Sequence, residues 1–377
     1  MNRLIILLPA IFLFIACTGP ETSESAINLQ KIAAAATEYD LEALTEVTGY
    51  VFLETNDSCL IRTVNRVEQH NSVYYINTVW ALYAFSEEGR YLNSFGKKGR
   101  GPGEFGFIKD FTVHREKDLV LLLTYNPNSV YLFTKSGQFL SAFPVEESSL
   151  QEIEFGDNDD IVLMCDNMDG SAAYSYLYYN LSGKLLDSRP QYYKFELTPV
   201  DGVYSAGISQ GLLFHDKGRL YTKEAHSDTA YIVSGRQLVP EYIFNTDGLG
   251  FTPEERAIGK YRVQFLRTDW FLHHGEHLIV RIGSPDHGSV VLFRNQKRGN
   301  DFAVRLTKKP KEDFGTARLN TMKHASDGEF FINLDAVVLK SMILSNPQSD
   351  DALRRFASEI DENSNPVIVR YKLTLPE

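Results

Sequence analysis

Histidines gather most densely at His273-His274-Gly275-Glu276-His277, and imidazoles at short spacing are common ligands of metal ions. The cluster stands between two runs that alternate like β-strands, so we expect it to form a hairpin turn. Three histidines so close together in a turn rarely converge on one ion. A metal site stays an alternative, and the sequence favours the turn.

Two acidic stretches, at 156–160 and 166–170, have the composition of calcium loops. Both lack the downstream carboxylate that an EF-hand loop requires. Aspartate and asparagine are also common in ordinary turns, because their side chains bond their own backbone, and we favour that interpretation. The sequence contains no His-Glu-x-x-His pair, so it offers no motif for a catalytic zinc.

These stretches lie between the strands of a repeat. When the glycine turns are aligned, residues 82–92, 130–140 and 176–186 match as strand, polar turn and strand, and 230–238 is a weaker copy. A further pair of strands precedes each hairpin. Four strands in a period of about 40 to 50 residues are typical of a β-propeller blade.

Two more units follow, at 264–306 and 317–375, the second with helical insertions near 337–344 and 350–360. Six units account for the chain. The sequence therefore predicts an all-β fold, a six-bladed β-propeller with a few short helices.

The ring must close, and the simplest closure pairs the two ends of the chain. We expect the strand at 47–54 to complete the sheet that holds 367–375. A further helix is predicted at 252–262, with Thr252 as its N-cap and Glu255 completing a capping box.

A glycine-rich turn connects the first two predicted blades, and its residues are Gly99, Arg100, Gly101, Pro102, Gly103, Glu104 and Phe105. Glycine and proline at this density exclude a helix or a buried strand, so we interpret the segment as a fixed corner. We expect Glu104 to accept backbone N–H bonds or to pair with Arg100, and Phe105 to fill an apolar gap. A phosphate loop would need a following helix and a Lys-Ser/Thr pair, which are missing.

The chain begins like an exported protein. Leu4 to Ala16 carries no charge and is too short to span a bilayer, which is typical of a signal peptide. Phe14-Ile15-Ala16-Cys17 resembles a bacterial lipobox, so we expect Cys17 to carry a lipid anchor in the outer membrane. An ordinary signal peptide is the alternative. The predicted division is a signal peptide at 1–17, a tether and lead-in helix at 18–45, and the propeller at 46–377.

The composition excludes one class of ligand and bears on the state of the cysteines. The net charge is −11 and basic residues do not cluster, so we exclude nucleic acid as a ligand. Cys59 and Cys165 lie far apart in separate strand patterns, and we expect packed thiols rather than a disulfide. We expect a monomer.

The segment at 99–105, the strand repeats, the lipoprotein start and the ending Asn365-Pro366-Val367-Ile368-Val369-Arg370-Tyr371-Lys372-Leu373 resemble the six-bladed β-propeller lipoproteins common in Bacteroidota, which are related in architecture to NHL-repeat proteins. The resemblance covers nearly all of the chain after the leader. It implies an outer-membrane or periplasmic lipoprotein and supplies no catalytic residues. The family often has an aspartate after the second strand of the first blade, where this chain has Asn77.

Propellers usually bind ligands at the mouth of the central channel. We expect this mouth on the face that carries the loops leading into each blade and the loops joining its second and third strands. The candidate residues are Asn77, Trp80, Lys98, Arg100, Tyr125, Asn126, Asp166, Asn167, Glu224, His226, Asp286 and His287. Aromatic platforms beside amides and carboxylates suit a sugar or a peptide, and the same residue types also suit ordinary solvated loops.

The leading hypothesis is a membrane-tethered propeller without enzymatic activity or cofactor, which binds a glycan, a peptide or a partner protein of the cell envelope. The alternative is a metal-dependent hydrolase or lyase, resembling six-bladed lactonases that hold calcium in the channel. A purely structural subunit is a third class that the sequence does not separate from the first.

Overall fold

The computed structural model describes residues 26–39, 42–99, 101, 103–198, 211–257, 264–306, 325–326, 328–346, 349 and 351–375. The predicted signal peptide with Cys17 lies outside the described residues, as do Arg100 and Pro102.

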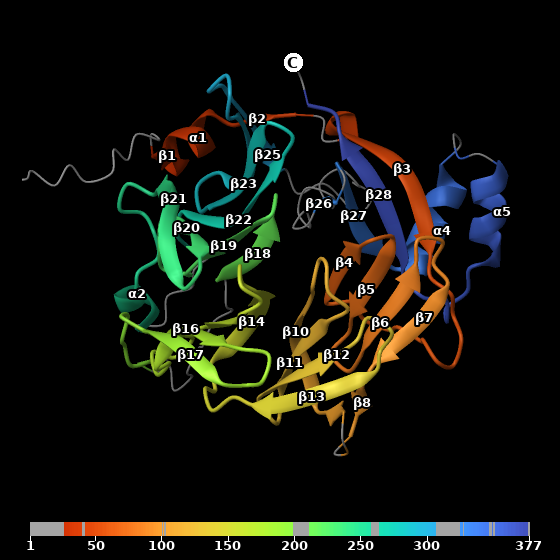
Figure 1. Ribbon diagram of the computed structural model, residues 1–377. Coiled ribbons are helices and arrows are strands. Elements are labelled where there is room, and N and C mark those ends of the chain that lie inside the picture. Colours follow the sequence, from red (N-terminus) through yellow and green to blue (C-terminus); the bar gives the residue numbers. More distant parts are fainter. Residues whose placement is uncertain are drawn as a thin grey trace, which may run out of the picture.

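Six antiparallel sheets stand around a central axis and form a six-bladed propeller, which confirms the predicted fold class (Figure 1). The first three blades are β4 (Arg66–His70), β5 (Val73–Asn77), β6 (Leu82–Ser86) and β7 (Tyr91–Phe95); β10 (Phe107–Val113), β11 (Val120–Tyr125), β12 (Ser129–Phe133) and β13 (Phe139–Pro144); and β14 (Leu150–Phe155), β15 (Ile161–Cys165), β16 (Tyr174–Tyr179) and β17 (Leu185–Pro190). The next two are β18 (Leu212–Asp216), β19 (Arg219–Lys223), β20 (Thr229–Ser234) and β21 (Gln237–Asn245); and β22 (Arg267–His274), β23 (His277–Ser284), β24 (Gly288–Asn295) and β25 (Asp301–Leu306). The sixth blade joins β26 (Ala325–Ser326), β27 (Glu329–Leu334), β28 (Val367–Leu373) and β3 (Thr45–Phe52).

The predicted repeat consists of the third and outer strands of successive blades. Its turn glycines, Gly89, Gly137 and Gly183, have φ values of 83°, 85° and 81°, which residues with a side chain rarely adopt. Glycine is therefore required at the corner of each hairpin, and the alignment of these glycines located the blades.

The ring closes between the two ends of the chain, as predicted. Strand β28 pairs antiparallel with β27 on one side and with β3 on the other, so that Ile368 lies opposite Val51. Asn365, just before β28, is 2% exposed and bonds three backbone groups of the segment after β3. This closure gives the outer edge of the last blade a partner strand.

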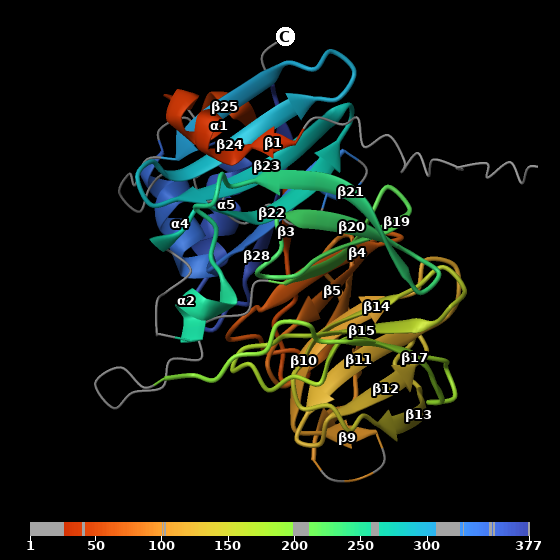
Figure 2. The same cartoon turned by 90° about the vertical axis from the view of Figure 1, so that its left-hand side faces the viewer.

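The segment ahead of β3 packs on the fourth and fifth blades. β1 (Ile27–Asn28) pairs parallel with β21, and β2 (Thr37–Glu38) pairs parallel with β25. Between them, α1 (Leu29–Ala35) is capped by the Asn28 side chain and buries Leu29 and Ile32. Figure 2 shows the helix against β24 and β25. A 3₁₀ turn, η1 (Glu42–Leu44), leads into β3.

Three more short helices lie in the described part of the chain. At the start of α2 (Pro253–Ala257) the backbone N–H of Glu255 donates to Thr252 Oγ1 over 3.2 Å, and the backbone N–H of Thr252 donates to Glu255 Oε2 over 3.3 Å, which confirms the predicted capping box. The rest of that predicted helix lies outside the described residues. α4 (Ala336–Ser345) and α5 (Asp351–Glu359) match the predicted insertions and lie outside the sixth blade (Figure 1). Within the described part of the chain, the helices are all too short or too polar to cross a membrane.

The glycine-rich turn between the first two blades contains two short strands, β8 (Lys97–Lys98) and β9 (Glu104–Phe105), which pair parallel to each other. Glu104 Oε2 accepts the backbone N–H of Gly101 over 2.8 Å, and its Oε1 lies 3.1 Å from Lys97 Nζ. Phe105 is fully buried, with its ring centre 5.4 Å from that of Tyr131. These contacts hold the loop in one shape.

Candidate functional site

The innermost strands of neighbouring blades belong to different sheets, and carboxylates connect them. Asp110 Oδ2 accepts the backbone N–H of Ile153 over 3.0 Å, which connects the second blade to the third. In the same way Glu152 accepts from Leu213 over 2.5 Å, and Asp216 accepts from His273 over 2.6 Å. Each bond satisfies an edge N–H that faces the channel. The inner wall is therefore a chain of polar contacts from blade to blade.

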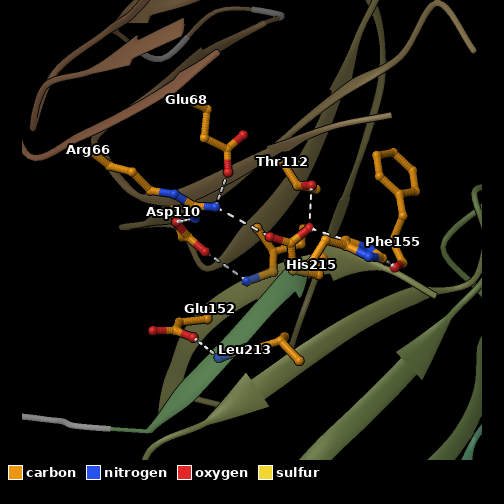
Figure 3. Close-up of polar contacts among 10 residues, drawn as sticks. Arg66, Glu68, Asp110, Thr112, Glu152, Phe155, Leu213 and His215 are labelled. Carbon is orange, nitrogen blue, oxygen red and sulfur yellow. Dashed lines mark hydrogen bonds and ion pairs between the residues drawn. The ribbon is translucent and has the colours of Figure 1, made fainter. Parts of the chain in front are cut away.

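At one level of the channel these contacts converge on Arg66 (Figure 3). Its guanidinium pairs with Glu68 on its own strand and with Asp110 of the second blade, and it lies 3.3 Å from Glu154 of the third. Thr112 donates to Glu154 over 2.6 Å. We call Arg66, Glu68, Asp110 and Glu154 the axial cluster. It carries one cationic group and three carboxylates, so it has an excess of acid.

Burial in the axial cluster raises the pKa of Glu68 and of Glu154 to about 7, although Arg66 opposes the rise. Burial alone would lower the pKa of Arg66, but the three carboxylates hold it well above its usual value. The folded cluster therefore keeps protons that an unfolded chain would release as the pH rises from 4.5 to about 7. Its contribution to stability falls as the pH rises through that window.

Glu68→Gln is accordingly expected to raise the free energy of unfolding relative to the natural chain at about pH 8, by roughly 1–3 kcal/mol, with little change at about pH 5. The amide oxygen can still accept a bond from Arg66, but it carries no charge that requires compensation. Urea unfolding at several pH values measures the difference. Glu116→Gln, in the exposed turn after β10, serves as the control. A difference that is independent of pH would contradict this account.

The axial cluster does not fit the calcium ion of the lactonase-like alternative. The Arg66 guanidinium lies among the three carboxylates, where a cation would bind. Within the described ranges, no group of three or more histidine, cysteine, aspartate or glutamate side chains is arranged to hold a metal ion. The axial cluster therefore gives no support to a calcium-dependent reaction.

The axial cluster separates two chambers of the channel. The upper chamber, about 620 Å³, opens on the face where Asn77 ends β5 and where the inner strands begin. Phe214, Trp270, Phe271 and Phe331 line it together with Asn65, Asn77, Gln151, Asn333 and Lys109. Arg66, Asp110 and Glu152 also line it, so its walls combine aromatic, amide and charged groups.

An aromatic strip adjoins the upper chamber across the seam of the first two blades. The rings of Trp80 and Phe107 lie 4.5 Å apart, and those of Phe107 and Tyr125 lie 6.3 Å apart. Lys98 Nζ lies 3.9 Å from the centre of the Trp80 ring, and Lys109 Nζ lies 5.1 Å from that of Tyr125. We call these five residues the shelf. Trp80 is 43% exposed and Tyr125 is 49% exposed, so the rings are open to solvent.

The turns that carry the shelf are fixed by short contacts. Thr78 Oγ1 accepts the backbone N–H groups of Trp80 and Ala81 and donates to the Ala81 carbonyl. Next to Phe107, a Cβ on Gly106 would come within 2.6 Å of the Asn126 carbonyl oxygen, so glycine is needed for the two loops to approach. The exposed rings are thus held in place before a ligand arrives, which lowers the entropy cost of binding.

The lower chamber, about 990 Å³, opens on the opposite face, where turns join the first and second strands of each blade. Five of the nine histidines line it, His70, His114, His215, His273 and His274. Burial lowers the pKa of His70, His215 and His274. His273 connects Asp216 (2.8 Å) to the Tyr242 hydroxyl (2.7 Å). The predicted hairpin turn is confirmed, since His274 lies opposite His277.

The structure brings together four of the candidate residues named from the sequence. Asn77 lines the upper chamber, and Trp80, Lys98 and Tyr125 belong to the shelf. Two others lie beside the shelf, since Asn126 follows Tyr125 in an exposed turn and Asp166 attracts the Lys109 ammonium group. The rest do not belong to it. Asp286 and His287 are in a surface turn, Asn167 accepts the backbone N–H of Ala172, Glu224 is partly buried near Arg189, and the His226 ring lies against Phe251. Arg100 lies outside the described residues.

Sequence reasoning missed the axial cluster and two shelf residues. The missed residues of the cluster are Arg66, Glu68, Asp110 and Glu154, with Thr112 and Glu152 beside them. A signal was present, because Arg66 and Asp110 are 44 residues apart, and Thr112 and Glu154 are 42 apart, which is the blade period. Polar residues at equivalent places of each first strand indicate side chains that share the axis. Phe107 and Lys109 were assigned only to a strand.

Residues 24–372 match the model of a family described as "Domain of unknown function (DUF4934)". Among solved structures, a Bacteroides fragilis protein described as exported is similar over 90% of this chain and 98% of its own, at 16% identity and a TM-score of 0.69. A member of the DUF4221 family from Bacteroides vulgatus is similar over 89% and 99%, at 12% identity and a TM-score of 0.51. These identities show the fold alone. No curated protein matches the chain.

Proposed function

The chain belongs to the DUF4934 family, a domain of unknown function, and on that premise we propose that it is a glycan-binding protein of the cell envelope without enzymatic activity. The observation that supports this most is the shelf, in which Phe107 lies beside both Trp80 and Tyr125 and the latter two rings are almost half exposed. A protein gains no stability from keeping large rings in water.

Sugars suit such a surface. The C–H groups on one side of a pyranose ring carry partial positive charge and pack on the negative face of an aromatic ring. The hydroxyl groups at the edge of the sugar need donors and acceptors, which the amides of the adjoining upper chamber supply. Peptides usually add to a free sheet edge or bind in a groove, whereas the shelf presents exposed ring faces at the ends of β10 and β11 and in the loop before β6. We therefore place a glycan ahead of a peptide or a partner protein.

Trp80→Ala is expected to weaken binding of a glycan by about tenfold or more, because it removes the largest stacking surface. Trp80→Phe should keep most of the affinity. The measurement is a glycan-array screen of the soluble domain followed by calorimetry with the best glycan. Leu140→Ala, an exposed apolar residue on β13, is the control. An array without any glycan bound, or a Trp80→Ala variant that binds equally well, would contradict the proposal.

The site would act at a membrane surface. The resemblance of residues 14–17 to a lipobox supports attachment through a lipid on Cys17, and the Bacteroides fragilis protein of the same fold is described as exported. We expect metabolic labelling with palmitate to mark the natural chain and not Cys17→Ala. Equal labelling of both would show that Cys17 is not the anchor.

A further inference from the structure

The two lysines of the shelf, Lys98 and Lys109, lie against aromatic rings. Lys98 Nζ is exposed and lies over the Trp80 ring, and Lys109 Nζ donates to the Leu150 carbonyl oxygen over 2.6 Å beside the Tyr125 ring. Among the described residues neither forms an ion pair, although the chain has 49 acidic and 38 basic side chains. Lys97, Lys117, Lys297 and Lys372 pair with carboxylates, whereas Lys340 resembles Lys109 in donating to a backbone carbonyl.

Lys109 is more than half buried, and burial lowers the pKa of its ammonium group. Electrostatic attraction to Asp166 raises this pKa and so opposes the effect of burial. A partly buried ammonium group whose hydrogen bond goes to a neutral carbonyl lacks a counter-charge. A bound anion would supply that charge. The shelf therefore presents positive charge at two of its rings on a protein with a net charge of −11.

We propose that the shelf selects a saccharide that carries an anionic group, which lies between Lys98 and Lys109 while the sugar rings pack on Trp80, Phe107 and Tyr125. This inference rests on the proposed glycan binding and adds the charge of the ligand. Lys98 covers the Trp80 ring when no ligand is bound, and its flexible side chain can turn to pair with the anion at the edge of the ring. The overall negative charge of the protein then works against unselective capture of acidic polymers.

The probe is trigalacturonic acid, compared with its carboxyl-reduced form, which has the same rings without charge. We expect the acid to bind about tenfold more tightly at low salt, and the difference to shrink as the salt concentration rises. Lys98→Met should remove most of the difference. Lys184→Met, an exposed lysine in the turn between β16 and β17, changes the net charge equally and should leave it intact.

A second measurement needs no ligand. Trp80 is largely accessible and Trp270, the other tryptophan, is 4% exposed, so soluble quenchers report on Trp80. The ratio of iodide quenching to quenching by neutral acrylamide should be about twofold higher in the natural chain than in Lys98→Met, because the Lys98 ammonium group attracts the iodide anion. An unchanged ratio would overturn the inference.

The outcomes separate the two proposals. Equal affinity for the acid and its reduced form would overturn the charge preference and leave glycan binding intact. Tighter binding of the reduced form, or no binding of either up to about 10 mM, would also overturn the preference. An empty array of neutral and acidic glycans would instead count against the proposed function itself.

Discussion

Replacing Arg66 by methionine is expected to lower the free energy of unfolding by about 3–5 kcal/mol at about pH 8. Methionine has a similar length but no charge, so Glu68, Asp110 and Glu154 would be left buried beside one another without a cation. At about pH 5 the cost should be smaller, since the two glutamates can then hold protons.

The midpoint of urea unfolding at both pH values measures this cost, provided that the slope of the transition is unchanged. Arg90→Met is the matched control, because Arg90 pairs with Glu88 at the surface, where both side chains are mostly exposed. A loss for Arg66→Met no larger than that of the control would show that the axial cluster does not hold the inner strands together.

Asn365→Leu is expected to cost a similar amount, about 3–5 kcal/mol, because one buried side chain satisfies three backbone groups. Asn365 Nδ2 donates to the carbonyl oxygens of Glu54 and Cys59, and Oδ1 accepts the N–H of Ile61, each over 2.7 Å. Leucine has the same number of side-chain heavy atoms in the same branched shape, but it is bulkier and bonds none of these groups. These bonds fix the start of the closing strand against the segment after β3.

Chemical unfolding tests this prediction too, with Asn363→Leu as the control. Asn363 is exposed two residues earlier, so its replacement should change the free energy of unfolding by less than about 0.5 kcal/mol. If Asn365→Leu were as stable as the natural chain, the closure would depend on the pairing of β28 with β3 alone.

Most of the fold could be predicted from local patterns. Gly89, Gly137 and Gly183 mark hairpin corners that only glycine tolerates, and their spacing revealed the blades before any long-range contact was known. The closing strand could be predicted because a ring of blades must close, and pairing a strand from one end of the chain with the blade at the other end is the simplest closure. The strands of the lead-in segment could not be predicted, because β1 and β2 are only two residues long and gain stability only from the blades on which they pack.

The site was harder to predict, and the reason is geometric. Trp80, Lys98 and Tyr125 could be named because loops on one face of a propeller lie near each other, yet which of them touch depends on the angle between blades. Arg66 and Glu154 are 88 residues apart and meet only because the inner strands converge at the axis. Alternation alone assigns such polar residues to a solvent-facing side of a strand. The blade period, applied to polar residues instead of glycines, would have identified them.

The central claim is that the shelf binds sugar rings, and a crystal structure of the protein with the tightest glycan from the array tests it most directly. We expect a pyranose ring packed on Trp80 at about 4–5 Å between ring centres, with the next sugar toward Tyr125. A glycan bound in the lower chamber among the histidines, with the shelf left bare, would contradict the account.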